Sequence, residues 1–216
     1  MSTCLSTITV VLADDHPVTR AGIRMVLEQA ADISVVGEAN DGGEAEKLVS
    51  ELHPKILLLD LIMPGPRPAE IEKWVWENYP ETIILILTGH DRDAHLARMV
   101  DAGAAGYLSK NESGDRLIDA IRRAAKGGSI FNEQQLARAR HWRNDVEKKW
   151  EHLTKQERKI LRLVSEGREN KEIAYTFKVT LRTVEKHLGN IYEKLEVKSK
   201  TEAALWWTKN GTDFTN

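Results

Sequence analysis

Between residues 8 and 126, short apolar segments alternate with helical ones, and this alternation limits the fold more than any other feature. The segment Lys55–Asp60 contains four consecutive apolar residues, so it has no polar face for solvent. A strand that is apolar on both sides is typical of a parallel sheet covered by helices on each face. The expected strands are Ile8–Ala13, Ile33–Val36, Lys55–Asp60, Thr82–Leu87 and Ala105–Leu108. The expected helices are Val18–Ala30, Gly43–Leu52, Glu70–Asn78, Asp91–Ala102 and Gly114–Lys126.

The last third of the chain has no strand pattern and is expected to be helical. Thr154 and Glu157 have the spacing of a capping box, and Ser199 and Glu202 repeat that spacing ahead of a last helix. Between them, the expected helix Leu181–Leu195 has one apolar face. That face is formed by Val184, Leu188, Ile191 and Leu195.

The chain therefore predicts two domains: an α/β domain over 6–128 and an all-α domain over 150–216. They are joined by a polar linker, 129–149, that is expected to be helical. The charge is divided in the same way, because residues 1–130 carry a net charge of −7 and residues 151–216 carry +3. This asymmetry indicates that the two domains have different partners.

The composition is that of an ordinary folded protein, with 41% hydrophobic and 30% charged residues over 216 positions. Intrinsic disorder and a disulfide scaffold are therefore unlikely classes for this chain. The segment Ile83–Leu87 is far shorter than a membrane span, and Met1–Thr7 does not read as a secretory signal. With Cys4 as its single cysteine, the chain is expected to work in a reducing cytoplasm, with no membrane partner.

Polar residues follow four of the expected strands at the point where each strand ends. They are Asp14, Asp15, Asp60, Thr88 and Lys110. Because the carboxyl ends of parallel strands meet at one rim, we expect these side chains to lie close together. Clustered carboxylates are suited to Mg²⁺, and a lysine and a hydroxyl are suited to a phosphoryl group. A central carboxylate can also act as a nucleophile that becomes phosphorylated.

Residues 8–128 resemble the receiver domain of bacterial two-component response regulators. The resemblance implies a flavodoxin-like, doubly wound fold, with a five-stranded parallel sheet in the order 2-1-3-4-5. The matching motifs are Asp14–Pro17, Asp60–Gly65, Thr88–Gly89 and Tyr107–Lys110.

The resemblance implies a chemical role for each of the residues at the rim. Asp60 is implied to be the phosphoacceptor, Lys110 to pair with the phosphoryl group and Thr88 to donate its hydroxyl to it. Tyr107 is implied to be a switch residue that turns inward when Thr88 moves.

The same resemblance implies one cofactor, Mg²⁺. Asp15 and Asp60 would bind it directly, together with the backbone carbonyl of Ile62. Asp14 would act mainly through water.

The C-terminal part, over about 150–207, resembles the LuxR-type DNA-binding domain, a four-helix fold with a helix-turn-helix. The motifs that carry the resemblance include Glu166–Gly167, Asn170–Ala174, Thr183–Val184 and Thr201–Ala204. Leu181–Leu195 would then be the recognition helix. The residues expected to contact DNA are Lys171, Arg182, Thr183, Glu185, Lys186, His187 and Asn190.

Two positions in the recognition helix depart from the family pattern. Relatives commonly have basic residues where this chain has Glu185 and Gly189. Glu185 either accepts from a cytosine amino group or repels phosphates, and Gly189 removes a side chain from the surface that would face DNA.

With both domains, the chain resembles the NarL/FixJ class of response regulators. The resemblance implies a phosphorylation-switched transcription factor rather than an enzyme. Its expected partners are a sensor histidine kinase, double-stranded DNA, RNA polymerase and, once phosphorylated, a second copy. One alternative is a receiver that controls a protein partner through a helical module with weak or lost DNA binding. Another is a constitutive DNA binder whose receiver only dimerises.

Overall fold

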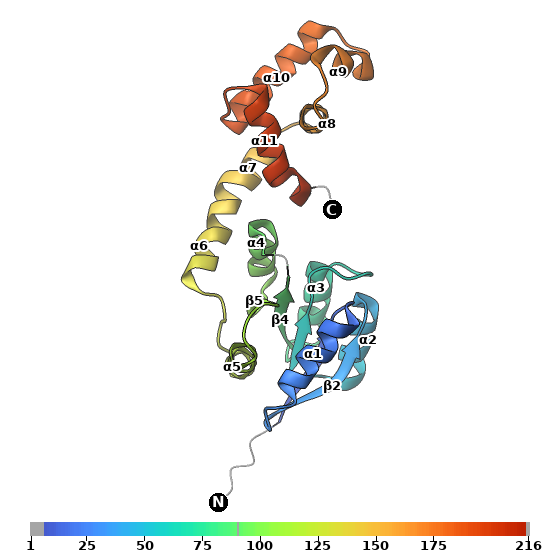
Figure 1. The fold of residues 1–216 in the computed structure, drawn as a ribbon, viewed down its shortest axis with the longest axis vertical. Coiled ribbons are helices and arrows are strands. Elements are labelled where there is room, and N and C mark those ends of the chain that lie inside the picture. Colours follow the sequence, from blue (N-terminus) through green and yellow to red (C-terminus); the bar gives the residue numbers. More distant parts are fainter. Residues whose placement is uncertain (1–6, 90, 215–216) are drawn as a thin grey trace, which may run out of the picture. The chain divides into compact units, whose positions relative to one another are not determined.

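The structure is a computed structural model that describes residues 7–89 and 91–214. Cys4, on which the expectation of a reducing compartment rests, lies outside the described residues. The chain divides into two compact units, one ending at Ala139 and the other beginning at Arg140 (Figure 1). We describe each unit by itself.

The first unit contains a five-stranded parallel sheet in the order β2-β1-β3-β4-β5, which confirms the expected fold and topology. The strands are β1 (Ile8–Ala13), β2 (Ile33–Ala39), β3 (Ile56–Leu59), β4 (Ile83–Thr88) and β5 (Gly106–Ser109). The helices are α1 (Pro17–Leu27), α2 (Gly42–Leu52), α3 (Pro68–Asn78), α4 (Asp93–Ala102) and α5 (Gly114–Ala125).

Several boundaries differ from the sequence-based expectation by one to three residues, and two of the differences have a clear physical reason. Strand β2 continues beyond Val36, because Glu38 and Ala39 still pair with the last residues of β1. Helix α4 begins at Asp93 instead of Asp91, because Arg92 has an extended backbone.

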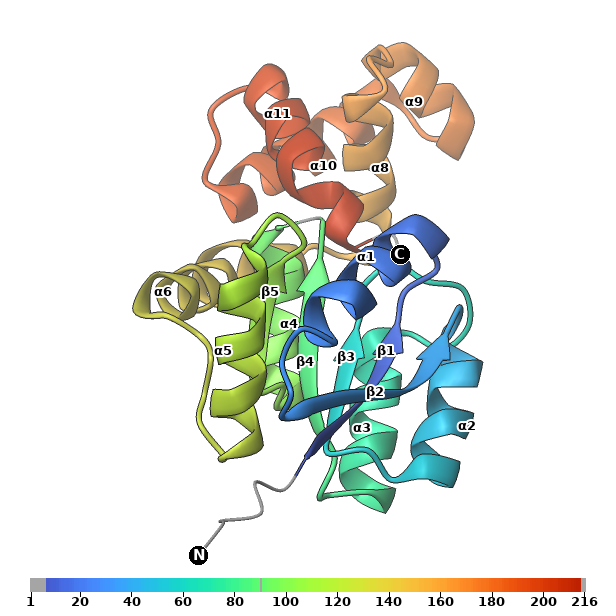
Figure 2. The ribbon, with the colours of Figure 1, turned by 60° about the horizontal axis from the view of Figure 1, so that its bottom comes forward.

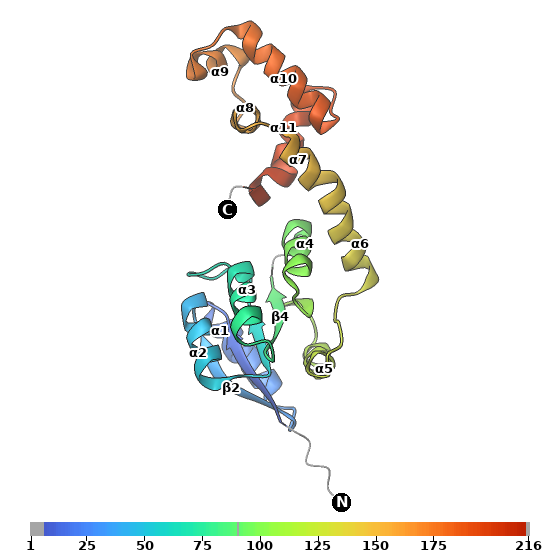
Figure 3. The ribbon, with the colours of Figure 1, turned by 180° about the vertical axis from the view of Figure 1, so that it is seen from behind.

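The helices cover the sheet on both faces. Helices α1 and α5 contact each other on one face, whereas α2, α3 and α4 form a row on the other (Figures 2 and 3). Strand β3 lies in the middle of the sheet and is buried along its whole length. Its two apolar faces therefore pack against both helical layers, as its sequence required.

A continuous helical stretch follows the sheet. It consists of α6 (Glu133–His141), a π-helical segment η1 (Trp142–Glu147) and α7 (Lys148–His152). Trp142 is buried and stacks on Phe214, with 5.6 Å between the ring centroids. Trp150 stacks on the same ring at 4.5 Å. These contacts attach the end of the stretch to the last residues of the second unit.

The second unit contains α8 (Lys155–Ser165), α9 (Asn170–Phe177), α10 (Leu181–Leu195), α11 (Lys200–Asn210) and a short 3₁₀ turn, η2 (Gly211–Phe214). Its core includes the four apolar residues of α10 named above, packed against α8 and α9. The capping box at Thr154 and Glu157 is confirmed, since each side chain accepts a hydrogen bond from the other's amide.

The second expected capping box is only half formed. The hydroxyl of Ser199 accepts from the amide of Glu202 at 3.1 Å. The carboxylate of Glu202, however, accepts from the amide of Lys198 at 2.8 Å, so the reciprocal bond to Ser199 is replaced. Among the described helices, none is long and apolar enough to span a membrane.

Candidate functional site

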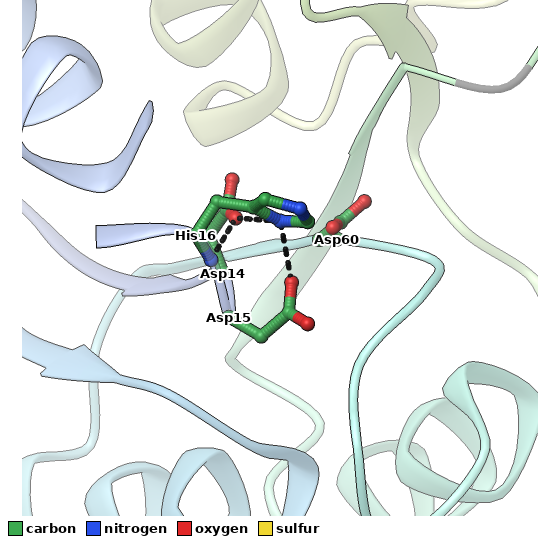
Figure 4. A group of neighbouring side chains, drawn as sticks. All are labelled: Asp14, Asp15, His16 and Asp60. Atoms are coloured by element: carbon green, nitrogen blue, oxygen red, sulfur yellow. Dashed lines mark hydrogen bonds and ion pairs between the residues drawn. The ribbon is translucent and has the colours of Figure 1, made fainter. Parts of the chain in front are cut away.

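The acidic residues predicted to meet at the rim of the sheet do meet. Oxygen or nitrogen atoms of Asp14, Asp15, His16 and Asp60 all lie within 4.8 Å of one another (Figure 4). Asp14 follows β1 and Asp60 follows β3, and these strands are neighbours in the sheet. Their side chains are almost fully buried, at 1% and 4% exposed. The site is therefore a shielded group of carboxylates.

The ammonium of Lys110 lies between two of these carboxylates. Its Nζ is 2.7 Å from Oδ2 of Asp60 and 2.8 Å from Oδ2 of Asp14. Lys110 directly follows β5, and its backbone amide donates a hydrogen bond to the carbonyl of Thr88 at the end of β4. This hydrogen bond fixes the backbone from which the side chain reaches the carboxylates. One positive charge thus offsets two buried negative ones, which is the arrangement that buried carboxylates require.

The surroundings shift the pKa of both central groups. Burial raises the pKa of Asp60, and this rise exceeds the opposing effect of the hydrogen bond and charge of Lys110. Burial lowers the pKa of Lys110, but its contacts with Asp14 and Asp60 outweigh burial, so the net pKa of the ammonium is raised. Lys110 therefore stays charged at neutral pH, and a second positive charge would favour the ionised form of Asp60.

The other predicted residues of the receiver lie around this group. Thr88 is buried at the end of β4. Tyr107 is on β5 and already points into the protein, with 2% of its surface exposed. Ile62 lies in the loop after β3 and exposes its side chain. That Tyr107 turns inward when Thr88 moves stays a prediction.

Two neighbours of the site were not assigned a role from the sequence. The Nδ1 atom of His16 lies 2.6 Å from a carboxylate oxygen of Asp15. The guanidinium of Arg20 donates to the carbonyl of Asp14 at 2.6 Å and so supports the loop after β1. The only hint of a role for His16 in the sequence is that it directly follows the acidic pair. Nothing in the sequence indicates a role for Arg20.

The first turns of α6 are attached to the start of α4 and to β5. Arg138 pairs with the carboxylates of Asp91 and Asp93 at the start of α4, with its Nη2 2.9 Å and 2.6 Å away. Gln135 donates to the carbonyl of Tyr107 at 2.9 Å. These contacts join residues far apart in the chain, so no periodic pattern in the sequence indicated them.

In the second unit, six of the seven predicted DNA-contacting residues lie on the surface of α10 that is not packed, and the seventh, Lys171, lies on α9. Thr180 caps this helix by accepting from the amide of Thr183 at 3.2 Å. On the packed side of α10, the Nζ of Lys194 lies 2.7 Å from a carboxylate oxygen of the buried Glu157 of α8. This ion pair holds α10 against α8. Exposed or partly exposed on the other side are Arg182, Thr183, Glu185, Lys186, His187 and Asn190.

Three of the predicted DNA-contacting residues are cations without a competing partner in the part of the chain that the structure describes. Within the described residues, Lys171, Arg182 and Lys186 form no ion pair and no side-chain hydrogen bond. Lys171 lies in the first turn of α9, where helix amides and a positive side chain together favour an anion. Exposed lysine and arginine side chains without such partners are suited to the phosphates of DNA.

The two unusual positions of α10 are on this same surface. Glu185 is exposed and places a negative charge beside Lys186. Gly189 is exposed, and no atom would lie within 4 Å of a Cβ added there. The structure thus has room for a longer side chain where the sequence has none.

Comparisons with known proteins agree with both units. Residues 10–122 match the family described as the response regulator receiver domain. Residues 151–207 match the luxR family of bacterial regulatory proteins. The chain is 38% identical over 207 residues to the transcriptional regulatory protein LiaR of Bacillus subtilis, which covers 94% of this chain and 98% of LiaR.

Solved structures of the response regulator RcsB have the same architecture. One is an RcsB–DNA complex, with a TM-score of 0.62, 27% identity, and coverage of 94% of this chain and 98% of that one. Another contains two RcsB dimers bound to two parallel DNAs, with a TM-score of 0.61 and 28% identity over 94% of this chain and 98% of that one.

Proposed function

This chain belongs to the response regulators that combine a receiver domain with a LuxR-type DNA-binding domain, and we propose that phosphorylation of Asp60 controls its binding to DNA. As a member of this family it is a DNA-binding regulator of transcription. The observation that carries the proposal is the position of Lys110, whose ammonium joins Asp14 and Asp60 at the rim of the sheet.

Asp60 is the residue best placed to accept the phosphoryl group. Its carboxylate oxygen would attack the phosphorus of a phosphohistidine on a sensor kinase. The new O–P bond forms as the P–N bond breaks, and the imidazole of the kinase leaves with the electron pair. Lys110 and the hydroxyl of Thr88 would contact the transferred phosphoryl oxygens, which need positive charge and hydrogen-bond donors.

The carboxylates of Asp14, Asp15 and Asp60 fit Mg²⁺, because they are hard oxygen ligands gathered within 4.8 Å. When bound, Mg²⁺ supplies positive charge that offsets the repulsion between the site and the incoming phosphoryl group. We propose that Asp15 and Asp60 bind it directly, that the backbone carbonyl of Ile62 completes the protein ligands, and that Asp14 acts through water.

The switch would act through Thr88 and Tyr107. Movement of Thr88 towards the phosphoryl group would change the packing of Tyr107, whose carbonyl accepts from Gln135 in α6. The linker 129–149, which is helical from Glu133 on, is therefore our proposed path between the two domains. A shift from 1:99 to 99:1 between two states requires about 5.5 kcal/mol of differential stabilisation.

On DNA, the exposed side of α10 would enter the major groove. Asn190 is suited to adenine, and Lys186 to guanine or to a phosphate. Lys171 would bind a phosphate at the start of α9. The remaining contacts that we propose come from Arg182, Thr183, Glu185 and His187.

A sensor histidine kinase and double-stranded DNA are the partners that the two domains imply. We propose that the phosphorylated chain binds DNA as a homodimer and acts on RNA polymerase there. Because its target is the chromosome, its place of action would be the cytoplasm. The transfer to Asp60 serves as a switch and does not turn over a small-molecule substrate.

The test is DNA binding by the full chain with and without beryllofluoride and Mg²⁺, which mimic the phosphoryl group. Genomic DNA fragments are captured by the wild type and by Asp60→Asn. We expect specific fragments to be enriched only by the wild type with the mimic. Enrichment by Asp60→Asn to the same degree would contradict the proposed switch.

A second candidate is favoured by Glu185 and Gly189, which reduce the positive surface of α10. In that case the helical domain would bind a protein instead of DNA. No enrichment of DNA under either condition, by protein shown to be folded, would support it. Equal enrichment with and without the mimic would instead indicate a constitutive DNA binder.

A further inference from the structure

A cavity of about 330 Å³ lies at the end of the sheet opposite Asp60. Its wall includes Ile84 near the start of β4, Ala105 just before β5 and Ser129 after α5. The phosphorylation site, in contrast, follows the carboxyl ends of the strands. The volume is at the lower end of the range of pockets that hold small organic molecules.

Glu72 of α3 lines this cavity and is the unusual feature of its wall. The side chain is 3% exposed, and within the described residues neither carboxyl oxygen has a hydrogen-bond partner. Buried polar groups without partners are rare and costly, so each one calls for an explanation. Burial alone raises the pKa of Glu72 to about 8, so the carboxyl is mainly protonated at neutral pH.

The surroundings of Glu72 favour a positive charge in the cavity. Helices α4 and α5 both end at its wall, where they contribute Gly103 and Gly127. The C-terminal end of a helix carries a partial negative charge. Among the described residues that line the cavity, Glu72 is the only ionisable one. The described residues of the wall therefore contribute a carboxyl and two helix ends and no positively charged side chain.

The open side of the cavity is marked by Trp76, one turn after Glu72 on α3. Its indole is 73% exposed, which is unusual for so large an apolar side chain. An aromatic face and a carboxylate are the two groups with which proteins bind organic cations. Apart from Thr82 and Ser129, the rest of the wall consists of apolar side chains and glycines, including Val75 and Pro80, and so offers contacts to a hydrocarbon body.

We propose that this cavity is a binding site for a small organic cation, an amine or amidine on an apolar body, with Glu72 as its counter-ion and Trp76 at its entrance. A divalent metal ion fits less well, because it requires several oxygen ligands and the wall supplies one carboxyl group. Binding converts the Glu72 carboxylic acid to a carboxylate, and the released proton passes to the buffer.

The test uses benzamidine and its neutral isostere benzamide with the full chain, measured by titration calorimetry at neutral pH. We expect the wild type to bind benzamidine at least about tenfold more tightly than benzamide. Titration in buffers of different ionisation enthalpy is expected to show release of about one proton per bound benzamidine. Glu72→Gln is expected to lose both the preference and the proton release.

The matched control is Glu77→Gln, which removes an exposed carboxylate from the same helix. It is expected to bind benzamidine as the wild type does. Because Glu72→Gln alters a buried position, Trp76→Ala provides a second test at an exposed position, with an expected loss of about two- to fivefold in affinity.

Two results would overturn the proposal. One is equal affinity of the wild type for benzamidine and benzamide, including no binding of either. The other is unchanged benzamidine affinity in both Glu72→Gln and Trp76→Ala. NMR signals of the receiver core show in each variant that the receiver is folded, so the outcome does not depend on the proposed function of Asp60.

Discussion

Arg138 donates two hydrogen bonds to the carboxylate of Asp91, at 2.9 and 3.0 Å. Its Nε donates a third, to Asp93, at 2.7 Å. A planar guanidinium held by two carboxylates is a specific contact rather than a general attraction between charges. It attaches α6, the start of the path to the DNA-binding unit, to the start of α4. A change at α4 would therefore be transmitted directly to α6.

We predict that Arg138→Ala loosens the first turns of α6. Partly exposed ion pairs contribute up to about 1 kcal/mol each. Losing two of them is expected to speed amide hydrogen exchange over 133–139 by roughly fivefold to thirtyfold. Exchange in the full-length chain, followed by mass spectrometry, measures this directly.

The control for this prediction is Arg140→Ala, which removes an exposed arginine from the same helix. Exchange over 133–139 should then stay at the wild-type rate. If Arg138→Ala and Arg140→Ala have the same effect, the pairs with Asp91 and Asp93 do not hold α6.

A second prediction concerns the charge balance at the phosphorylation site. Lys110→Met leaves the buried carboxylates of Asp14 and Asp60 without their cation. Removing one partner of a buried ion pair typically costs about 3–5 kcal/mol, so we expect a loss of this order in the free energy of unfolding of the receiver. Without the ammonium of Lys110, the carboxylates of the folded variant bind protons more tightly than those of the folded wild type. We therefore expect the loss in the free energy of unfolding to shrink as the pH falls from about 7 to about 5.5.

Urea unfolding of the full chain, followed by NMR signals of the receiver core, measures this loss at each pH. Lys73→Met is the control, because its side chain is exposed and 3.8 Å from Glu77. A loss in Lys110→Met no larger than in the control would show that the bridge contributes little.

The rim of the sheet could be predicted because each of its residues directly follows an apolar strand. The apolar segment Ile56–Leu59 determines that a strand is buried there, and Asp60 then has to lie at its carboxyl end. The order of the strands brings Asp14 and Lys110 to the same place. Local pattern and topology together are sufficient for this site.

Glu72 could not be predicted in this way. Within α3, the apolar positions Ile71 and Val75 identify the buried face, and a charged residue beside Ile71 is ordinarily at its solvated edge. Glu72 is nevertheless buried, and it shares the wall of its cavity with residues from the ends of α4 and α5 and from the loop after α3. That burial depends on tertiary packing, which has no periodic signal in the sequence.

A third prediction follows from the pKa of Glu72, which burial raises from 4.5 to about 8. The folded chain keeps this proton up to about pH 8, whereas the unfolded chain loses it near pH 4.5. The stability from the protonated carboxyl is therefore complete below pH 4.5 and is lost progressively as the pH rises towards 8. The expected slope in this window is about 1.4 kcal/mol per pH unit.

Glu72→Gln removes the titrating group, so the receiver of this variant should lose less stability than the wild type between about pH 6 and about pH 8. Urea unfolding at several pH values, with Glu77→Gln as the control, tests this. Parallel pH profiles for the wild type and Glu72→Gln would mean that Glu72 is ionised in the folded chain at neutral pH.

The fourth prediction concerns Gly189, which leaves an exposed gap in the middle of α10. A Cβ at this position meets no atom within 4 Å, so Gly189→Ala is expected to stabilise the helix by up to about 1 kcal/mol. Gly189→Lys adds the same helix preference and a positive charge near Lys186. If this surface faces DNA phosphates, one added contact makes the slope of log K against log salt steeper by about 0.9.

The two effects are separated by measuring both variants on the same DNA at several salt concentrations. Gly189→Ala changes stability without adding charge, so its salt slope should equal that of the wild type. Thr208→Lys places the same charge on the exposed side of α11 and should also leave the slope unchanged. A steeper slope for Gly189→Lys alone would locate the DNA at the exposed side of α10. Equal slopes for all three variants would place the DNA elsewhere, because the charge added to α10 would then have no phosphate to neutralise.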